Sequence, residues 1–295
     1  MIAVLVALSI VLLAGIVIVG YIGPRILLMP QRRGPDFYRK RYGFAHPSDL
    51  GLKFEDGSVT TEDGLRLSYW AIEPQDCDHR NGYVIYLHGI TDSKSSGLNY
   101  AKELIEFCQK VFLLDMRSHG ESDGKYCTYG YYEKRDVSKL IDKIRDDDPE
   151  AVISLLGVSM GAAIALQTAA ADDRVSRVIA VAPFYDLFSI ALDHQVKKIG
   201  IRSRILLRLV LHQAERMARF KADEVSPALD IGKIQVPVLI VHGEEDKTVK
   251  KEYSKILQGL NHGAQLLAIP GAGHIDVLEK GGKNYLEELE KFLRS

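Results

Sequence analysis

Cysteine is scarce in this chain, and net charge is nearly absent. Among 295 residues there are three cysteines, Cys77, Cys108 and Cys127, which are widely spaced and odd in number. This spacing excludes a disulfide framework and the paired pattern of a zinc site, and it favours a reducing compartment. Lys and Arg number 38 against 39 Asp and Glu, so the formal net charge is -1. No overall basic field therefore indicates a nucleic-acid partner.

No internal repeat interrupts the sequence, and from about residue 55 strand-like apolar runs alternate with helix-like segments. A hairpin is expected between Val59 and Pro74, and a last helix from about residue 276 to 293. Strands that are separated by helices predict a mainly parallel central sheet with helices on both faces, which is an α/β fold. The predicted parallel strands are residues 83–87, 111–115, 151–156, 175–182, 236–241 and 266–269.

The alternation stops between residues 184 and 236. This stretch is too long for a simple connection between two strands. Within it, Ile201, Ile205, Leu206, Leu209 and Val210 share one face at helical spacing. We interpret the segment as a helical cap inserted into a domain of residues 55–295; its apolar stripe either lines an acyl pocket or packs the cap onto the sheet.

A serine stands between two glycines directly after a predicted strand. The pentapeptide Gly157-Val-Ser-Met-Gly161 follows the apolar run 151–156 and precedes the Ala- and Leu-rich segment 162–171. Ser159 is therefore expected on a strand-to-helix turn, where glycines allow tight backbone geometry and expose the hydroxyl above the sheet. Helix capping by Ser159 is the plainer alternative. The flanking strand and helix favour a nucleophile.

A serine nucleophile needs a base and an acid that orients the base. His274 follows the strand 266–269, and Asp246 follows the strand 236–241. Because the carboxyl ends of parallel strands meet at one edge of a sheet, these residues should lie near Ser159. We expect Ser159 to attack an acyl carbon, His274 to transfer the proton and Asp246 to hold the imidazole. Glu244 or Glu245 is the alternative acid.

Two backbone amides are expected to bind the negative oxygen of a tetrahedral intermediate. One is the amide of Met160, which follows the nucleophile. The other is the amide of Ile90, in the loop after the strand 83–87. His88 and Gly89 begin this loop, and we interpret them as its support. His88 comes too early in the chain for the Ser, Asp, His order, so it is a less favoured base.

In these motifs the chain resembles the α/β-hydrolases, in the group that includes monoacylglycerol lipases, carboxylesterases and serine aminopeptidase-like hydrolases. The resemblance spans roughly residues 55 to 295 and implies the α/β-hydrolase fold with a Ser-Asp-His triad. In such relatives the segment corresponding to 115–122 usually has glycine where this chain has Ser118. The matching segments are His88-Gly89, residues 115–122, residues 157–161, residues 242–246 and Gly273-His274.

The N-terminal stretch from Met1 to Pro24 contains no charged residue. Its length, about 34 Å as a helix, is enough for a hydrocarbon core of about 30 Å. We therefore expect one membrane-spanning helix over residues 1–24, followed by a juxtamembrane connector over residues 25–54. Basic residues follow the stretch, which predicts a cytoplasmic catalytic domain. Their side chains could rest on anionic headgroups. Cleavage and export is the competing interpretation.

Together these features predict a membrane-anchored serine hydrolase that cleaves an acyl ester of a lipid or small molecule. The same triad also serves peptidases, amidases and acyltransferases, and a binding protein without turnover is the non-enzymatic alternative. No metal or organic cofactor is implied, nucleic acid is not an expected partner, and nothing in the sequence indicates an oligomeric state.

Overall fold

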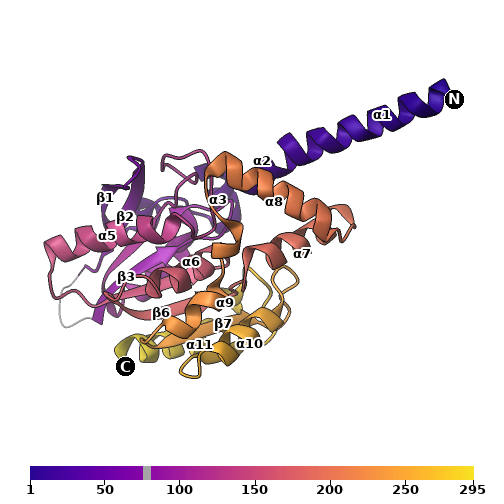
Figure 1. Cartoon of the computed structure of the whole chain (residues 1–295). Coiled ribbons are helices and arrows are strands. Elements are labelled where there is room, and N and C mark those ends of the chain that lie inside the picture. Colours follow the sequence, from indigo (N-terminus) through magenta and orange to yellow (C-terminus); the bar gives the residue numbers. More distant parts are fainter. Residues whose placement is uncertain (76–80) are drawn as a thin grey trace.

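The computed structural model describes residues 1–75 and 81–295, so the expectation for Cys77 falls outside the described residues. Eight strands form one sheet in the order β1-β2-β4-β3-β5-β6-β7-β8 (Figure 1). Strand β2 is antiparallel to both neighbours, and the pairings from β4 to β8 are parallel, as expected for a mainly parallel sheet. The strands are β1 (Lys53–Thr60), β2 (Arg66–Glu73), β3 (Asn81–Leu87), β4 (Cys108–Leu114), β5 (Ile153–Val158), β6 (Val175–Val181), β7 (Val238–Gly243) and β8 (Gln265–Ile269).

Helices cover both faces of this sheet. Because side chains alternate along a strand, Ile85 and Leu87 of β3 enter one apolar core, and Val84 and Tyr86 enter the other. The first core is completed by α5 (Glu133–Asp147), α6 (Met160–Ala169) and α10 (Lys251–Leu260). The second is completed by α4 (Leu98–Leu104) and α11 (Val277–Arg294). The carboxyl edge of the parallel strands is thereby held between two packed layers.

The segment between β6 and β7 is helical, as expected. It contains α7 (Leu187–Ile199), α8 (Arg204–Ala218) and α9 (Pro227–Asp230), with short 3-10 turns at Ala222–Glu224 and Ile231–Lys233. Leu207, Leu211 and Ala214 of α8 enter an apolar cluster with residues of α7. No residue of the predicted stripe belongs to this cluster, and Ile201, Ile205 and Leu209 are exposed. Packing of α8 therefore uses the neighbouring helix face.

The N-terminal apolar stretch is not one continuous α-helix. It consists of α1 (Ile2–Val17), a π-helical turn (Ile18–Ile22) and α2 (Gly23–Leu28), because the hydrogen-bonding pattern changes where the π turn begins. No helix in the described part of the chain is both long and apolar enough to cross a membrane. This finding does not support the expected membrane-spanning helix over residues 1–24.

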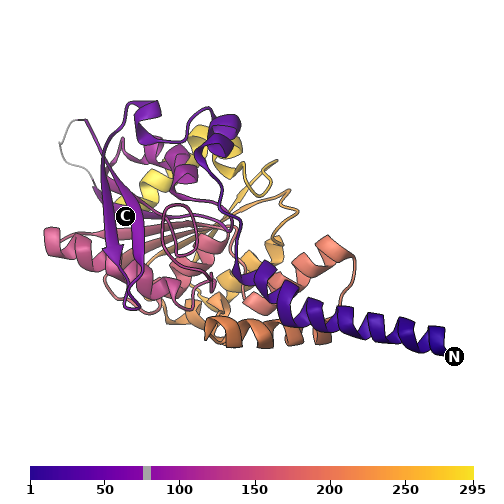
Figure 2. The same cartoon turned by 90° about the horizontal axis from the view of Figure 1, so that it is seen from above.

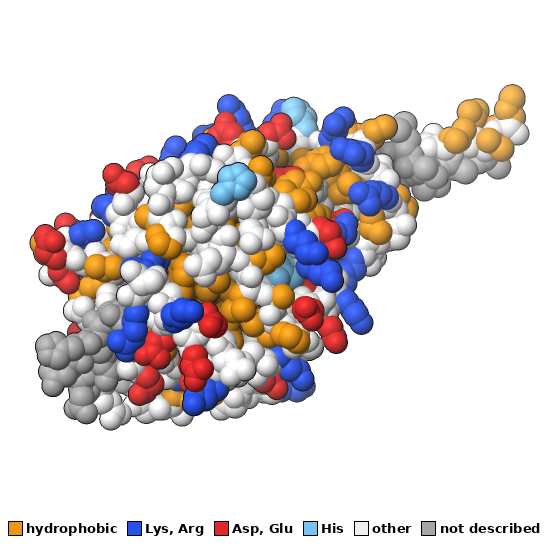
Figure 3. Space-filling model, turned by 90° about the horizontal axis from the view of Figure 1, so that it is seen from below, with side chains coloured by type: hydrophobic (Ala, Val, Ile, Leu, Met, Phe, Trp, Pro, Cys, Tyr) orange, Lys and Arg blue, Asp and Glu red, His pale blue; other side chains and the backbone are white. Residues whose placement is uncertain are grey.

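The two parts of the N-terminal stretch lie differently on the molecule. Helix α1 projects away from the body (Figure 2), whereas Leu28 at the end of α2 is fully buried in the cluster of α7 and α8. Hydrophobic side chains also gather on the body beside the base of the projecting helix, and charges of both signs are interspersed over the face shown (Figure 3).

Residues 25–54 are packed onto the α/β domain. They include α3 (Pro35–Tyr42) and a 3-10 turn (Pro47–Leu50), and Tyr38 is 1% exposed. The Arg32 guanidinium donates hydrogen bonds to four backbone carbonyls, those of His119, Gly120, Ser122 and Gly124. The Arg32 side chain therefore binds backbone carbonyls of its own chain and does not extend toward lipid headgroups.

Candidate active site

Ser159 lies on a strained turn between β5 and α6. Its backbone φ is 56° and ψ is -113°, a conformation that non-glycine residues seldom adopt and that marks functional sites. The turn is possible because Gly157 and Gly161 approach backbone atoms closely. A side chain on Gly157 would collide with the Gly161 carbonyl, and one on Gly161 would collide with that of Leu87. The glycines therefore allow the hydroxyl to stand at the carboxyl edge of the sheet.

The structure brings Ser159, His274 and Asp246 together. The distance from His274 Nε2 to Ser159 Oγ is 3.0 Å, and the distance from His274 Nδ1 to Asp246 Oδ2 is 2.7 Å. Because the Asp246 carboxylate only accepts hydrogen bonds, Nδ1 carries the proton and Nε2 is free to accept one from the serine. The Asp246 side chain is fully buried, and that of His274 is 15% exposed.

The loop after β7 holds Asp246 in place. Its Oδ1 accepts hydrogen bonds from the amides of Thr248 (2.7 Å) and Val249 (2.9 Å). Burial of the carboxyl opposes ionisation, but the hydrogen bonds from His274 and these amides outweigh it, so the pKa of Asp246 lies below its ordinary value. Glu244 and Glu245, the alternative acids, are exposed. The geometry therefore favours Asp246.

His242 is a further support, and it opens the matching segment 242–246. Its buried ring makes contact with Ser254 Oγ through Nδ1 (2.7 Å) and donates from Nε2 to the Val249 carbonyl (3.1 Å). The same Nε2 lies 3.4 Å from Asp246 Oδ2. Burial lowers the pKa of His242 and keeps it neutral. The matching segment 242–246 contained this histidine, but the sequence assigned a role only to Asp246 and its neighbouring glutamates.

The loop after β3 reaches the nucleophile. A side chain placed on Gly89 would have its Cβ 3.6 Å from Ser159 Cβ, and Ile90 is the next residue. Met160 begins α6 directly after Ser159. His88 is buried, donates from Nδ1 to the Gly89 carbonyl (2.8 Å) and accepts from the Met116 amide at Nε2 (3.0 Å). Both ring nitrogens of His88 are therefore hydrogen-bonded to backbone groups, whereas those of His274 face Ser159 and Asp246.

Loop 115–122 contains a second left-handed residue. Ser118 has a φ of 67°, which explains physically why glycine suits this position in similar hydrolases. Arg117 beside it is buried, and its guanidinium pairs with both carboxylate oxygens of Asp136 at 2.6 and 2.7 Å. A buried ion pair therefore holds this loop, although Ser118 occupies a position that favours glycine.

Helix α7 of the insertion lies near the site. The pKa of His194 is lowered first by burial and then by the charges of Lys198, Lys197 and His274, so His194 lies within electrostatic reach of His274. On the same helix, Asp193 accepts hydrogen bonds from Tyr253 and, at 2.6 Å, from Lys250. Across the described residues, no three His, Cys, Asp or Glu side chains are grouped so that they could hold a metal ion.

Comparison with known proteins identifies the class. An esterase of Pyrococcus furiosus matches with a TM-score of 0.71 and 23% identity, over 91% of this chain and 97% of that one. An esterase of Exiguobacterium antarcticum matches with a TM-score of 0.62 and 19% identity, over 82% of this chain and 100% of that one. These likenesses show that the fold is the α/β-hydrolase fold, as the motifs predicted.

A family model described as serine aminopeptidase, S33 matches residues 78–229, just over half of the chain. The chain therefore belongs to this family of α/β-hydrolases. Similar sequences include the uncharacterised protein YqkD of Bacillus subtilis, with 27% identity over 91% of this chain and 89% of that protein. The α/β-hydrolase domain-containing protein WAV2 of Arabidopsis thaliana is 26% identical over 83% of this chain and 82% of that protein. Membership of this family supports a hydrolase.

Proposed function

We propose that the protein is a serine hydrolase that cleaves acyl esters through an acyl-enzyme on Ser159. The observation that carries this proposal is His274, whose two ring nitrogens lie 3.0 Å from Ser159 Oγ and 2.7 Å from Asp246 Oδ2. These distances fit a nucleophile, its base and the acid that fixes the tautomer of the base. The strained φ of Ser159 supports the same assignment, because strain of this kind clusters at functional sites.

In the proposed reaction, Ser159 Oγ adds to the acyl carbon while its proton passes to His274 Nε2. The negative oxygen of the tetrahedral intermediate accepts hydrogen bonds from the amides of Met160 and Ile90, each typically worth about 2.7 to 4 kcal/mol. The ester C–O bond then breaks, and the alcohol leaves with the proton from His274. Water repeats the two steps on the acyl-enzyme, which releases the acid and restores Ser159.

Peptidase activity is the second candidate, because the family model is described as serine aminopeptidase. An aminopeptidase must bind the free ammonium group of its substrate, and a carboxylate is the natural partner for this group. Asp193 on α7 is already paired with Lys250 and Tyr253. Glu244 and Glu245, on the loop that carries Asp246, are exposed and could accept such a group, so a comparison of ester with amide turnover decides between the two candidates.

A fluorophosphonate probe tests the proposal on the full chain. Wild-type protein should bind the probe covalently and hydrolyse p-nitrophenyl esters faster than aminoacyl anilides of the same acyl size. Ser159→Ala should lose labelling and lower kcat on the order of 10⁶-fold, as removal of a serine nucleophile does elsewhere. Ser154→Ala, five residues earlier on β5, is the matched control and should keep both activities.

Three outcomes would contradict the proposal. Labelling that persists in Ser159→Ala would remove this residue from the mechanism. Faster cleavage of anilides than of esters would assign the site to a peptidase. A folded wild-type protein that neither binds the probe nor hydrolyses any substrate would favour the non-enzymatic alternative.

A further inference from the structure

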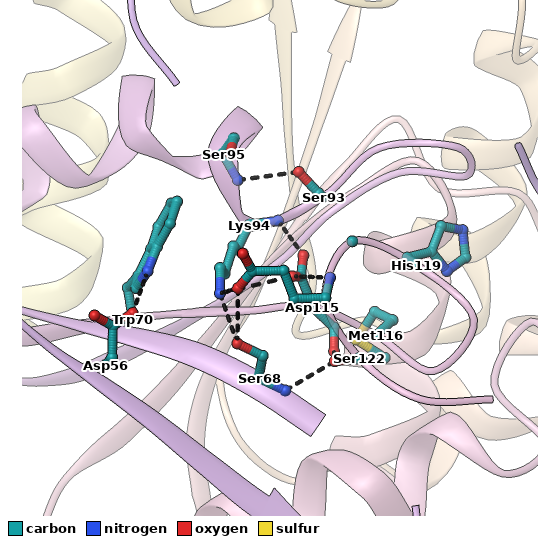
Figure 4. Close-up of polar contacts among 12 residues, drawn as sticks. Asp56, Ser68, Trp70, Ser93, Lys94, Ser95, Asp115, Met116, His119 and Ser122 are labelled. Atoms are coloured by element: carbon teal, nitrogen blue, oxygen red, sulfur yellow. Dashed lines mark hydrogen bonds and ion pairs between the residues drawn. The ribbon is translucent and has the colours of Figure 1, made fainter. Parts of the chain in front are cut away.

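A buried lysine lies behind the loop that carries Ile90. Lys94 is 2% exposed, whereas lysine is almost never fully buried without a partner. Its Nζ lies 2.6 Å from Ser68 Oγ, 2.6 Å from Glu121 Oε2 and 3.8 Å from Asp115 Oδ2. The ammonium also stands 4.5 Å from the centre of the Trp70 ring (Figure 4). Two carboxylates and an aromatic ring therefore compensate its charge.

Asp115 joins the loop after β3 to the loop after β4. Its fully buried carboxylate accepts a hydrogen bond from the Lys94 amide at Oδ1 (2.7 Å) and from the Glu121 amide at Oδ2 (2.8 Å). Burial raises the pKa of Asp115 to about 6, while Lys94 and the two amides oppose this effect. The charged carboxylate that accepts both amides therefore depends on the ammonium of Lys94.

The turn that presents Ile90 is fixed at both ends. The Asp92 amide donates to the Gly89 carbonyl (3.1 Å) across this turn, and Thr91 within it has a φ of 63°. A left-handed conformation in a threonine persists only where the surroundings hold it. His88 before the turn accepts from the Met116 amide, and Lys94 after the turn donates its amide to Asp115. Both ends are thus attached to adjacent residues at the end of β4.

We propose that Lys94 is a positioning residue for hydrolysis: its ammonium compensates the Asp115 carboxylate, which fixes the turn so that the Ile90 amide meets the oxyanion. This inference rests on the proposed function. The ammonium touches no reacting atom and acts through Asp115. Removing it leaves a buried carboxylate that is uncompensated, so the carboxylate becomes protonated or the loop moves toward water. Either change displaces the Ile90 amide.

The test compares Lys94→Met, which keeps length and loses charge, with Lys102→Met, an exposed lysine on α4. Active sites are counted in each full-length protein by stoichiometric fluorophosphonate labelling. We then measure kcat and KM for a short p-nitrophenyl ester. The inhibition constant of a trifluoromethyl ketone is also measured, because its adduct with Ser159 carries a tetrahedral oxyanion.

For Lys94→Met we expect kcat per labelled site to fall about 10- to 100-fold, which is less than the loss of a whole oxyanion donor, about 10² to 10³. KM should stay within about twofold, since ground-state binding does not use the oxyanion amides. The inhibition constant of the ketone should rise by the same factor as kcat falls. Lys102→Met should match wild type in all three quantities.

A purely structural lysine would give a different result. It would lower the number of labelled sites or the melting temperature, while kcat per site and the ketone constant stayed at wild-type values; that outcome overturns the proposal. If Lys94→Met does not fold, Asp115→Asn carries the same test, with the same coupled change in kcat and inhibition constant required. A wild-type protein that fails to label at Ser159 would refute the proposed function, whereas an active wild type matched by both variants refutes only this inference.

Discussion

Two polar networks meet at the carboxyl edge of the sheet, and they are built in opposite ways. In the proposed reaction network, Ser159, His274 and Asp246 form a single chain of hydrogen bonds, and His274 keeps some exposure. In the support network, which comprises Lys94, Asp115, Arg117 and Asp136, every member is buried. A group that transfers a proton must be able to change partners, whereas a group that fixes a loop must not.

This contrast separates two kinds of mutational effect. Changes in the reaction network should lower the rate of turnover with little loss of stability, because few packing contacts depend on it. Changes in the support network should lower the free energy of unfolding, because they leave buried charges without partners. Lys94 belongs to the support network, but we expect it to affect the rate as well, because it helps to fix the loop that carries Ile90.

The largest rate effect outside the nucleophile is expected for Asp246→Asn. An asparagine cannot hold the Nδ1-protonated tautomer of His274 as the carboxylate does, so kcat should fall about 10⁴-fold, as it does in other serine hydrolases with this change. The melting temperature should change far less than in the Asp136 variant below. Glu245→Gln, an exposed neighbour on the same loop, is the control. An equal loss in Glu245→Gln would reassign the acid and remove Asp246 from the reaction network.

Sequence patterns predicted the fold, and they predicted three residues that the structure brings together, Ser159, Asp246 and His274, because both depend on local signals. The glycines around Ser159 and the apolar strands before Asp246 and His274 are recognisable within a few residues of sequence. Because the carboxyl ends of parallel strands meet at one edge of the sheet, the three residues are then expected to lie together. The predicted sheet, its helices on both faces and the helical insertion follow from the same periodicity.

The support network and the N-terminal packing depend on contacts between distant segments, which local patterns do not record. Lys94 stands among serines in a polar stretch, and nothing in its neighbours indicates burial. Arg32 lies in a segment that looks like a basic connector, yet its partners are some 90 residues later in the chain. The length and hydropathy of residues 1–24 indicated one long helix, and nothing in the sequence indicated the π turn that divides it.

The support network is tested most strongly by Asp136→Ala. Arg117 would keep only Asp63, whose side chain is 53% exposed, and removal of one partner from a buried ion pair costs about 3 to 5 kcal/mol. Denaturant unfolding should show this loss, while kcat per labelled site stays within a few-fold of wild type. Asp63→Ala removes the exposed partner and should cost only about 0 to 1 kcal/mol. An equal loss of unfolding free energy in Asp136→Ala and Asp63→Ala would show that the burial of Asp136 does not make its ion pair more important than that of Asp63.

The smallest effect concerns pH and His119, whose ring packs 4.9 Å from that of His88 in the loop before Ile90. His119 donates from Nδ1 to the Arg117 carbonyl (2.9 Å), and its buried Nε2 has no hydrogen-bond partner. Burial lowers the pKa of His119 to about 4; the hydrogen bond to the Arg117 carbonyl and the charge of Glu133 oppose this shift, and the charge of Arg32 adds to it. The folded protein therefore keeps this imidazole neutral at pH values where the unfolded chain, near its ordinary pKa, already binds a proton.

Stability must then fall as the pH drops from the ordinary histidine pKa, about 6.5, toward the folded value, with a slope of up to about 1.4 kcal/mol per pH unit for one proton. His119→Gln keeps a donor for the Arg117 carbonyl and cannot take up a proton, so its unfolding free energy should depend less steeply on pH over this range. Asp115 and Asp136, whose pKa values are raised to about 6, act in the opposite direction but are common to both proteins and cancel in the difference. Urea unfolding at several pH values measures the slopes, with His262→Gln at an exposed position as the control. Parallel curves for wild type and His119→Gln would mean that the folded protein protonates His119 as readily as the unfolded chain, and that the surroundings of His119 are open to water.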